Sequence, residues 1–306
     1  TLLATRAPVI VCPAMHTEMW EQPSIQENVG VLASRGVTVI GPEDGRLAGG
    51  DVGAGRLADP ATVVAAAEEV LGATRGDAGG DLAGLTVLVT AGGTREPICP
   101  VRFLGNRSSG KQGHALVAEA AARGAQVRCV TTQPGTAPAG PGIDVTAVDT
   151  AAEMAAAVAA QAVDADIVLM AAAVADFRPV EVATEKIKKG DGPAEIRLEP
   201  TVDILAELGR SRSNGQVLVG FAAETQDLRQ NAAAKLAAKG IDLIVANDVS
   251  APRVGFEHDT NAVLVLDAGG GAREVPLADK REVAGVVLDA ALAIHKTNRT
   301  GNGDAR

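Results

Sequence analysis

Short apolar runs alternate with alanine-rich stretches over most of the chain, and this pattern limits the folds open to it. The stretches at 112–123, 150–162 and 225–239 are typical of helices, and the runs between them are TVLVT, QVRCVT, DIVLM, QVLVG and DLIVA. Strands that are apolar on both faces and separated by helices are typical of a parallel sheet covered on both sides. We therefore expect an α/β fold with a Rossmann-like, mostly parallel sheet.

A glycine-rich stretch divides the chain. Residues 72–84, GATRGDAGGDLAG, have no apolar periodicity and predict a linker. A shorter strand–helix region occupies 1–71, and the main domain is expected at 85–295. The polar sequence from 296 to 306 predicts a disordered tail. Because Thr1 is not a natural start, we also expect an upstream segment to be missing.

Composition excludes several classes of function. The net charge of −10 argues against a nucleic-acid-binding surface, which is normally basic. Three cysteines lie far apart without metal-ligand spacing, which favours a reduced, cytoplasmic chain. No apolar run has the length of a membrane span, and no signal peptide is visible. We expect small-molecule ligands, with no nucleic-acid or membrane partner.

Ligands of open parallel sheets bind beyond the carboxyl ends of the strands. After TVLVT comes AGGTR, after DIVLM comes AAAVADF, after QVLVG comes FAAET, and after DLIVA comes NDVS. Such small residues permit close backbone approach by a flat or phosphorylated ligand. Gly92 and Gly93 are therefore predicted to turn backbone N–H groups toward an anion, and the alternative is a tight turn without a ligand.

Two nucleotide motifs are absent. The stretch from Gly105 to Lys111 fits G-x-x-x-x-G-K, but Gln112 stands where a P-loop has the serine or threonine that binds Mg²⁺. TAGGTREP does not match the G-x-G-x-x-G dinucleotide motif either. These two standard motifs therefore do not identify the chain as a nucleotide-binding protein.

Basic residues are grouped despite the acidic composition. Lys186 and Lys188 fall in EKIKK with Lys189, and Lys235 and Lys239 are spaced to share one helix face. Each group alone is compatible with a solvated surface. Together with Arg95 and Arg102 near the glycine turn, they favour a polyphosphate pocket.

Five blocks of the sequence resemble one family. VLVTAGGTREPICPVRFLGNRSSGKQG, MAAAVADFRP, EKIKK, VGFAAET and LIVANDVS resemble phosphopantothenoylcysteine synthetase, the second half of the bifunctional coenzyme A biosynthesis protein of bacteria. The likeness covers about residues 85–292. PAMHTEMW and GGDVGAGRLADP resemble the end of a phosphopantothenoylcysteine decarboxylase, a flavodoxin-like FMN protein.

The resemblance implies a reaction in two steps. The carboxylate of 4′-phosphopantothenate attacks the α-phosphate of CTP, which gives an acyl-cytidylate and pyrophosphate, and the amine of L-cysteine then displaces CMP. The protein positions the substrates and neutralises charge at the phosphates. Lys186 matches the family's essential lysine and Asn106 the asparagine that handles the acyl-cytidylate. Arg102 is the matching basic residue near the substrate or the intermediate.

Nucleotide contacts and a metal also follow from the resemblance. Mg²⁺ is expected to be held mainly by the CTP phosphates, and its protein ligands are left open. Asp176 is expected either to accept from the ribose or the cytosine or to help hold this ion. Val202 stands where the family usually has proline. The expected nucleotide-binding residues are Gly92, Gly93, Met170, Ala171, Ala172, Asp176, Lys186, Val202, Asp203, Ile204, Leu205, Phe221, Lys235 and Lys239.

The first region departs from its family. The flap motif that usually carries a cysteine proton donor reads AGGD here, so Gly49 takes the cysteine position, and His16 replaces the asparagine of the PAMN motif. Met15 and His16 are the expected decarboxylase substrate-binding residues. FMN-dependent decarboxylation to 4′-phosphopantetheine is expected only of the full-length protein.

Assembly is implied by the family alone. Synthetase domains of this type form homodimers in which the EKIKK segment crosses to the neighbour, and the flavoprotein halves form trimers. Two other classes remain open on the residues: an NAD(P)-dependent Rossmann oxidoreductase and a non-catalytic nucleotide-binding module.

Overall fold

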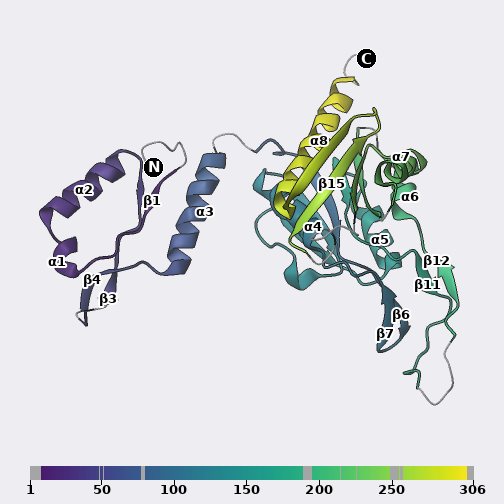
Figure 1. Ribbon diagram of the computed structural model, residues 1–306, viewed down its shortest axis with the longest axis horizontal. Coiled ribbons are helices and arrows are strands. Elements are labelled where there is room, and N and C mark those ends of the chain that lie inside the picture. The colour runs from purple at the N-terminus through teal and green to yellow at the C-terminus, as the bar shows by residue number, and fades with distance from the viewer. Residues whose placement is uncertain are drawn as a thin grey trace. The chain divides into compact units, whose positions relative to one another are not determined.

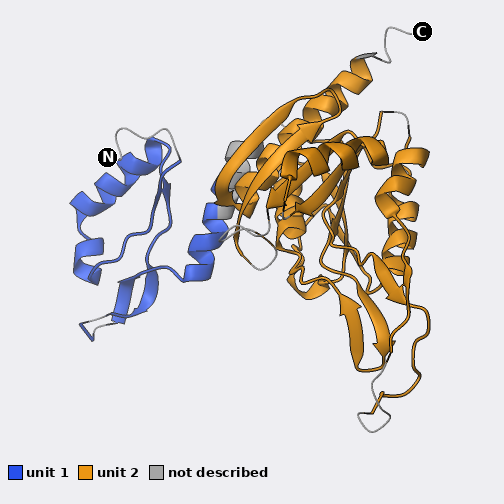
Figure 2. Cartoon of the chain, turned by 45° about the vertical axis from the view of Figure 1, so that its right-hand side comes forward, with its two compact units in different colours: residues 1–79 blue, residues 80–306 orange. Residues whose placement is uncertain are grey.

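The strands that follow residue 80 are rich in buried valine, leucine and isoleucine. The computed structural model describes residues 8–47, 49–50, 52–76, 80–188, 195–213, 215–224, 226–248, 255 and 258–301. The chain divides into two compact units, Thr1–Gly79 and Gly80–Arg306, which we call unit 1 and unit 2 (Figure 2).

Within the described part of unit 2, eight strands form one sheet in the order β16, β15, β14, β13, β10, β5, β8, β9 (Figure 1). Neighbours from β14 to β9 run parallel, and β15 and β16 add an antiparallel edge. The predicted α/β class and mostly parallel Rossmann-like sheet are confirmed. The strands are β5 (Thr86–Ala91), β8 (Gln126–Thr131), β9 (Ile143–Ala147), β10 (Ile167–Met170), β13 (Val217–Glu224), β14 (Leu243–Asp248), β15 (Thr260–Asp267) and β16 (Ala272–Asp279).

Helices cover both faces of this sheet. Val87 and Val89 of β5 belong to one apolar cluster and Leu88 to the other, because successive side chains of a strand point to opposite faces. The first cluster includes residues of α4 (Lys111–Ala122) and α8 (Lys280–Gly301). The second includes residues of α5 (Ala151–Gln161), α6 (Ile204–Ser211) and α7 (Leu228–Lys239). A short 3₁₀ helix, Pro134–Thr136, follows β8.

Local sequence explains where these helices begin and end. Thr150 accepts from the backbone N–H of Glu153, whose carboxylate accepts from the Thr150 N–H, so a capping box begins α5. Gly240 ends α7 with φ of 61°, a left-handed conformation that glycine adopts at little cost.

Two β-ribbons project beyond the carboxyl ends of the parallel strands (Figure 1). One pairs β6 (Arg95–Cys99) with β7 (Arg102–Gly105), and the other pairs β11 (Phe177–Pro179) with β12 (Leu198–Pro200). Strands β6 and β11 lie against each other. We call the two ribbons together the double-hairpin arm.

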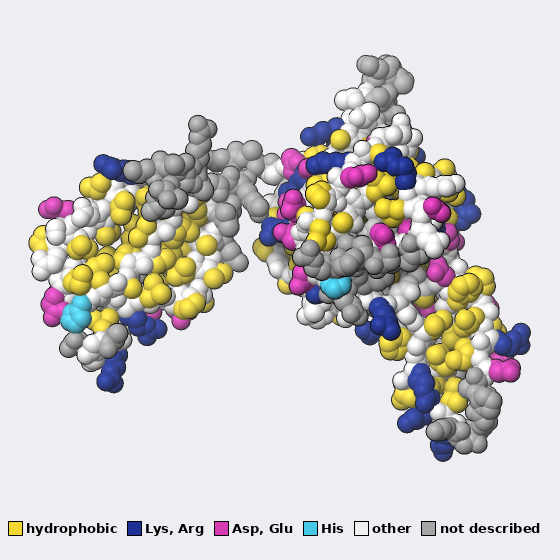
Figure 3. Space-filling model, viewed as in Figure 1, with side chains coloured by type: hydrophobic (Ala, Val, Ile, Leu, Met, Phe, Trp, Pro, Cys, Tyr) yellow, Lys and Arg dark blue, Asp and Glu magenta, His cyan; other side chains and the backbone are white. Residues whose placement is uncertain are grey.

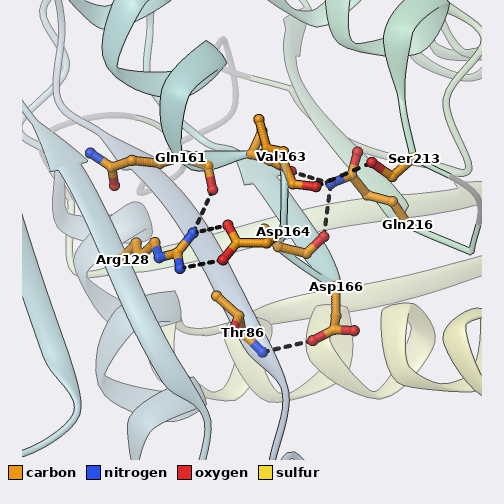
Figure 4. Close-up of polar contacts among 10 residues, drawn as sticks. Thr86, Arg128, Gln161, Val163, Asp164, Asp166, Ser213 and Gln216 are labelled. Carbon is orange, nitrogen blue, oxygen red and sulfur yellow. Dashed lines mark hydrogen bonds and ion pairs between the residues drawn. The ribbon is translucent and has the colours of Figure 1, made fainter.

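Polar side chains close the opposite, amino-terminal end of the sheet (Figure 4). The Thr86 N–H donates to the Asp166 carboxylate at 2.8 Å, and the Arg128 guanidinium donates to Asp164 at 2.9 Å. The Gln216 amide donates to two backbone carbonyls, of Ala162 and Ala165. These bonds satisfy groups at the strand starts, so this end of the sheet is structural.

Unit 1 combines short strands with helices. They are β1 (Ile10–Val11), α1 (Thr17–Trp20), α2 (Pro23–Ser34), β2 (Thr38–Val39), β3 (Glu43–Arg46), β4 (Val52–Arg56) and α3 (Pro60–Gly76). β1 and β2 pair parallel, and β3 and β4 form an antiparallel ribbon.

The predicted linker and tail need correction. The last turn of α3 reaches Gly76, and Leu82 is fully buried in the first apolar cluster while Asp81 pairs with Arg123, so both ends of the 72–84 stretch are structured. Helix α8 continues to Gly301, past the predicted start of the tail at 296, and the Thr297 hydroxyl donates back to the Ala293 carbonyl. Among the described residues, no helix is long and apolar enough to cross a membrane.

Candidate active site

A pocket of about 620 Å³ lies at the carboxyl ends of the parallel strands in unit 2. Residues that follow β10, together with residues of β13 and β14 themselves, line it, as expected for an open parallel sheet. Its size falls in the range of small-molecule sites. Of the residues predicted from the sequence, the pocket is lined by Asn106, Met170, Ala171, Ala172, Asp176, Val202, Asp203, Ile204, Leu205, Phe221, Lys235 and Lys239.

The loop after β10, residues 171–176, forms one wall of the pocket and is held by hydroxyl groups. The buried Thr90 hydroxyl accepts from the Ala172 N–H at 3.1 Å, and the buried Thr94 hydroxyl accepts from the Ala175 N–H at 2.9 Å. The Thr201 hydroxyl donates to the Ala175 carbonyl at 2.5 Å. The backbone of this wall is therefore preorganised, with small side chains that leave it accessible.

Asn106 closes the same loop from the other side. Its side-chain nitrogen donates to the carbonyls of Ala173 at 3.3 Å and Val174 at 3.1 Å. Asn106 follows β7, so this contact joins the double-hairpin arm to the loop after β10. In this arrangement the amide donors are engaged by protein, and the amide oxygen is the group left to accept from a ligand.

The lysines of α7 are held by carboxylates. Lys235 Nζ lies 2.6 Å from Glu224, and Lys239 Nζ lies 2.7 Å from Asp203. Asp203 also accepts from the Ala206 N–H and so caps α6. Both ammonium groups line the pocket in fixed positions, one turn apart on α7.

Gly92 and Gly93 do not line the pocket. A Cβ on Gly92 would lie 2.1 Å from the Thr132 hydroxyl, and the residue has a φ of 89°. A Cβ on Gly93 would lie 2.7 Å from the Asn106 carbonyl oxygen. Contacts within the protein therefore account for both glycines, where the sequence suggested clearance for a ligand.

Arg102 and Lys186 also lie outside the pocket lining. Arg102 Nη1 donates to the Ile187 carbonyl at 3.0 Å, and the Ala183 N–H donates to the Ile98 carbonyl. These bonds fasten the segment that carries the exposed Lys186 along the double-hairpin arm. Lys189 lies outside the described residues.

Several pocket residues were not among the predicted site residues. Gly110 and Lys111 end the rejected P-loop-like stretch, yet α4 begins there and they line the pocket. Asn247 follows the apolar run of β14, so the strand-end rule could have identified it. Asn261 and Lys280 come from β15 and the start of α8, and only the tertiary fold brings them in.

A second pocket, of about 370 Å³, lies within unit 1. It is lined by the predicted Met15 and His16, by Gly49 of the AGGD motif, and by Arg46 and Arg56. His16 pairs with Glu18. The parallel pairing in the described part of unit 1 extends over two residues per strand, so these residues alone offer a cationic cleft but lack the row of strand ends where a flavin binds an α/β sheet.

Metal ligands are not clustered in the described part of the chain, where no group of three histidine, cysteine or carboxylate side chains could hold an ion. The exposed Asp176 carboxylate on the pocket wall suits a cation carried by a phosphorylated ligand.

Comparisons with known proteins agree with this arrangement. Residues 82–294 match the model of the DNA/pantothenate metabolism flavoprotein C-terminal domain, and residues 1–72 match the flavoprotein model. The chain is 47% identical over 301 residues to the coenzyme A biosynthesis bifunctional protein CoaBC of Mycobacterium tuberculosis, which covers 95% of this chain and 71% of the relative. The same protein of Bacillus subtilis is 44% identical and covers 97% of this chain and 72% of the relative.

A solved structure shows the same fold. The crystal structure of the C-terminal domain of a coenzyme A biosynthesis bifunctional protein CoaBC has a TM-score of 0.59 and 36% identity, covering 71% of this chain and 98% of that chain. The sequence blocks, the sheet and these matches agree, so the chain belongs to the family of the coenzyme A biosynthesis bifunctional proteins.

Proposed function

We propose that unit 2 joins 4′-phosphopantothenate to L-cysteine at the expense of CTP, through an acyl-cytidylate, with release of pyrophosphate and then CMP. One observation carries the proposal. The blocks that resemble the synthetase family lie far apart in the sequence, yet Asn106, Asp176, Phe221 and Asn247 line one pocket. A pocket that gathers four such blocks supports a shared site.

For this reaction the protein must position the substrates and compensate the negative charge of the phosphates. A carboxylate does not react with an amine until its oxygen becomes part of a good leaving group, which the cytidylate supplies. The backbone of Ala171 and Ala172 and the ring of Phe221 are suited to hold the nucleoside, and Lys235 and Lys239 to compensate phosphate charge. When bound with CTP, Mg²⁺ would lower the charge of the phosphates, and Asp176 is the protein group that would meet it.

Lys186 fits this proposal if it contributes to the pocket of a second copy of the chain in a homodimer. It lies outside the pocket of its own chain, on the double-hairpin arm. Apolar side chains gather on the arm's surface (Figure 3). They include Val101, Phe103, Phe177, Val180, Val182 and Leu198, each at least 42% exposed. Such a patch is typical of a protein interface, which supports a homodimer through the arm.

We assign no decarboxylation step to unit 1. Gly49 cannot donate a proton where the family has a cysteine, and the parallel strands β1 and β2 pair over only two residues each. FMN-dependent conversion of the product to 4′-phosphopantetheine therefore remains outside the activity that we propose for this chain.

Product analysis tests the proposal against its rivals. The chain is incubated with 4′-phosphopantothenate, L-cysteine and Mg²⁺, with CTP, ATP or no nucleotide, and the products are identified by mass spectrometry. We expect 4′-phosphopantothenoylcysteine and CMP with CTP. Tight CTP binding without product would favour a nucleotide-binding module, and NADH binding with hydride transfer would favour an oxidoreductase.

A further inference from the structure

A buried lysine stands on the side of the pocket away from Lys235 and Lys239. Lys280 is the first residue of α8, lines the pocket, and is 6% exposed. Lysine is almost never buried to this degree unless its ammonium group is paired. Helix α7, which carries Lys235 and Lys239, packs on one face of the sheet. Helices α4 and α8, which carry Lys111 and Lys280, pack on the other.

The backbone of Lys280 carries its structural role. Its N–H donates to the Asp259 carbonyl at 3.1 Å, and its carbonyl accepts from the Gln112 amide at 3.1 Å. Asn261 in turn donates to Gln112. These bonds tie α8 to α4 and to the start of β15. They would form with any side chain at position 280, so they do not require an ammonium group.

Among the described contacts of the Lys280 ammonium group is a backbone carbonyl on the pocket lining. Lys280 Nζ donates to the Gly255 carbonyl at 3.0 Å, and Gly255 also lines the pocket. Lys111, whose Nζ lies 2.7 Å from Asp259, is a second cation on the same wall. Burial first, and then the charge of Lys111, lower the pKa of Lys280 to about 8, and Asp259 partly opposes them. A bound anion would reverse this destabilisation of the ammonium form.

We propose that the Lys280 ammonium binds a phosphate group of a substrate held in the pocket. The identity of the substrates rests on the proposed function, which supplies two separate phosphate-bearing groups, the triphosphate of CTP and the phosphate monoester of 4′-phosphopantothenate. The pocket has lysines on two sides, from helices on opposite faces of the sheet, and the substrates bring two separate phosphate groups. Lys235 and Lys239 meet one of them, and Lys280 with Lys111 meets the other.

Calorimetric titration of the full chain with CTP, inorganic pyrophosphate and 4′-phosphopantothenate tests this assignment. A hydrogen bond to a charged group contributes about 1.5–3 kcal/mol. Lys280→Gln should therefore lower the affinity for the ligand whose phosphate Lys280 binds by about 10- to 100-fold. Lys280→Arg should recover part of the loss. Arg281→Gln removes the neighbouring cation, which pairs with Glu119 outside the pocket, and should change nothing.

The pattern of losses identifies the phosphate. A loss confined to CTP and pyrophosphate assigns Lys280 to the triphosphate, and a loss confined to 4′-phosphopantothenate assigns it to the monoester. Binding of all three ligands to Lys280→Gln within twofold of the wild type overturns the proposal, as does a wild-type chain that binds none of them. A wild type that binds these ligands but releases no pyrophosphate from CTP contradicts the proposed function and leaves this inference standing.

Proton uptake and thermal unfolding separate a binding role from a structural one. Among the described residues, Lys111 on α4 and Asp259 before β15 act electrostatically on Lys280, and His258 acts on Asp259. At pH 8, binding to the wild type should take up protons as Lys280 becomes fully charged, and binding to Lys280→Gln should take up fewer. If Lys280→Gln does not fold, Lys280→Met retains the apolar stem. It should unfold no earlier than the wild type at pH 7 while still losing phosphate affinity.

Discussion

The side-chain amide of Asn106 donates to the carbonyl oxygen of Val174 at 3.1 Å, and this bond ties the arm to the pocket wall. It gives Asn106 a positioning role that its place in the sequence did not reveal. The wall it holds, residues 171–176, contains the backbone groups expected to face the nucleotide. A change at Asn106 should therefore act on the second step of the reaction through the shape of this wall as well as through direct contact.

Asn106→Asp keeps the side chain's shape but sets a carboxylate against two carbonyl oxygens. Charge repulsion and the loss of the N–H donor should weaken the contact between residue 106 and the pocket wall by about 1.5–3 kcal/mol. We expect pyrophosphate release to continue while formation of phosphopantothenoylcysteine falls about 10- to 100-fold, so that the acyl-cytidylate accumulates. Quenched-flow assays of the two steps measure this. Arg107→Gln, next in sequence and outside the pocket, is the control. Equal loss in both steps would contradict a specific role of Asn106 in the second step.

Thr201 fixes the end of the wall that carries Asp176. Its hydroxyl donates to the Ala175 carbonyl and its N–H to the Asp176 carbonyl at 3.0 Å. Thr201→Val retains volume and removes only the hydroxyl bond. Because such a bond contributes about 1 kcal/mol, the KM for CTP should rise about fivefold with little change in melting temperature. Thr136→Val, on an exposed 3₁₀ turn, should leave the KM unchanged, and an unchanged KM in Thr201→Val would refute the account of the wall.

The parts of the fold and the site that depend on neighbouring residues could be predicted from the sequence, and the parts that depend on tertiary contacts could not. β5 and β10 were predictable because their apolar runs stop at small residues. The strand-end rule then marked the segments that carry Asp176 and Phe221, and the family resemblance identified the two residues. Lys280 was not predictable, since it enters the site only because β15 and β16 run antiparallel and return α8 to the side of α4. The engagement of Asn106 with Val174 likewise depends on side-chain geometry that no local pattern encodes.

Gly92 illustrates a motif whose cause lies within the protein. Its φ of 89° and the 2.1 Å approach to the Thr132 hydroxyl leave no room for a side chain. Gly92→Ala should lower the free energy of unfolding by about 1–3 kcal/mol. Thr132→Ala should restore part of this, because it removes the clash and leaves the backbone strain. Urea denaturation measures both. Gly135→Ala, at an open position, should be neutral, and an equally small effect at Gly92 would contradict the packing argument.

Lys186 offers a test of shared sites. Lys186→Gln alone should abolish pyrophosphate release. If the lysine serves the partner's pocket, mixing Lys186→Gln with an inactive Asn106→Ala chain creates mixed dimers in which one pocket has both residues intact. Activity should then return to about a quarter of the wild-type level after random exchange of subunits. A mixture that stays inactive although exchange is shown by mass-tagged chains would place Lys186 in the pocket of its own chain.

The central claim is that this pocket activates a carboxylate with CTP before cysteine enters. The most direct measurement is pyrophosphate release from the chain with CTP, Mg²⁺ and 4′-phosphopantothenate, with and without L-cysteine. The account predicts release that requires 4′-phosphopantothenate, with CMP appearing only after cysteine is added. CTP cleavage that ignores 4′-phosphopantothenate, or none at all by a chain that binds CTP, would contradict it.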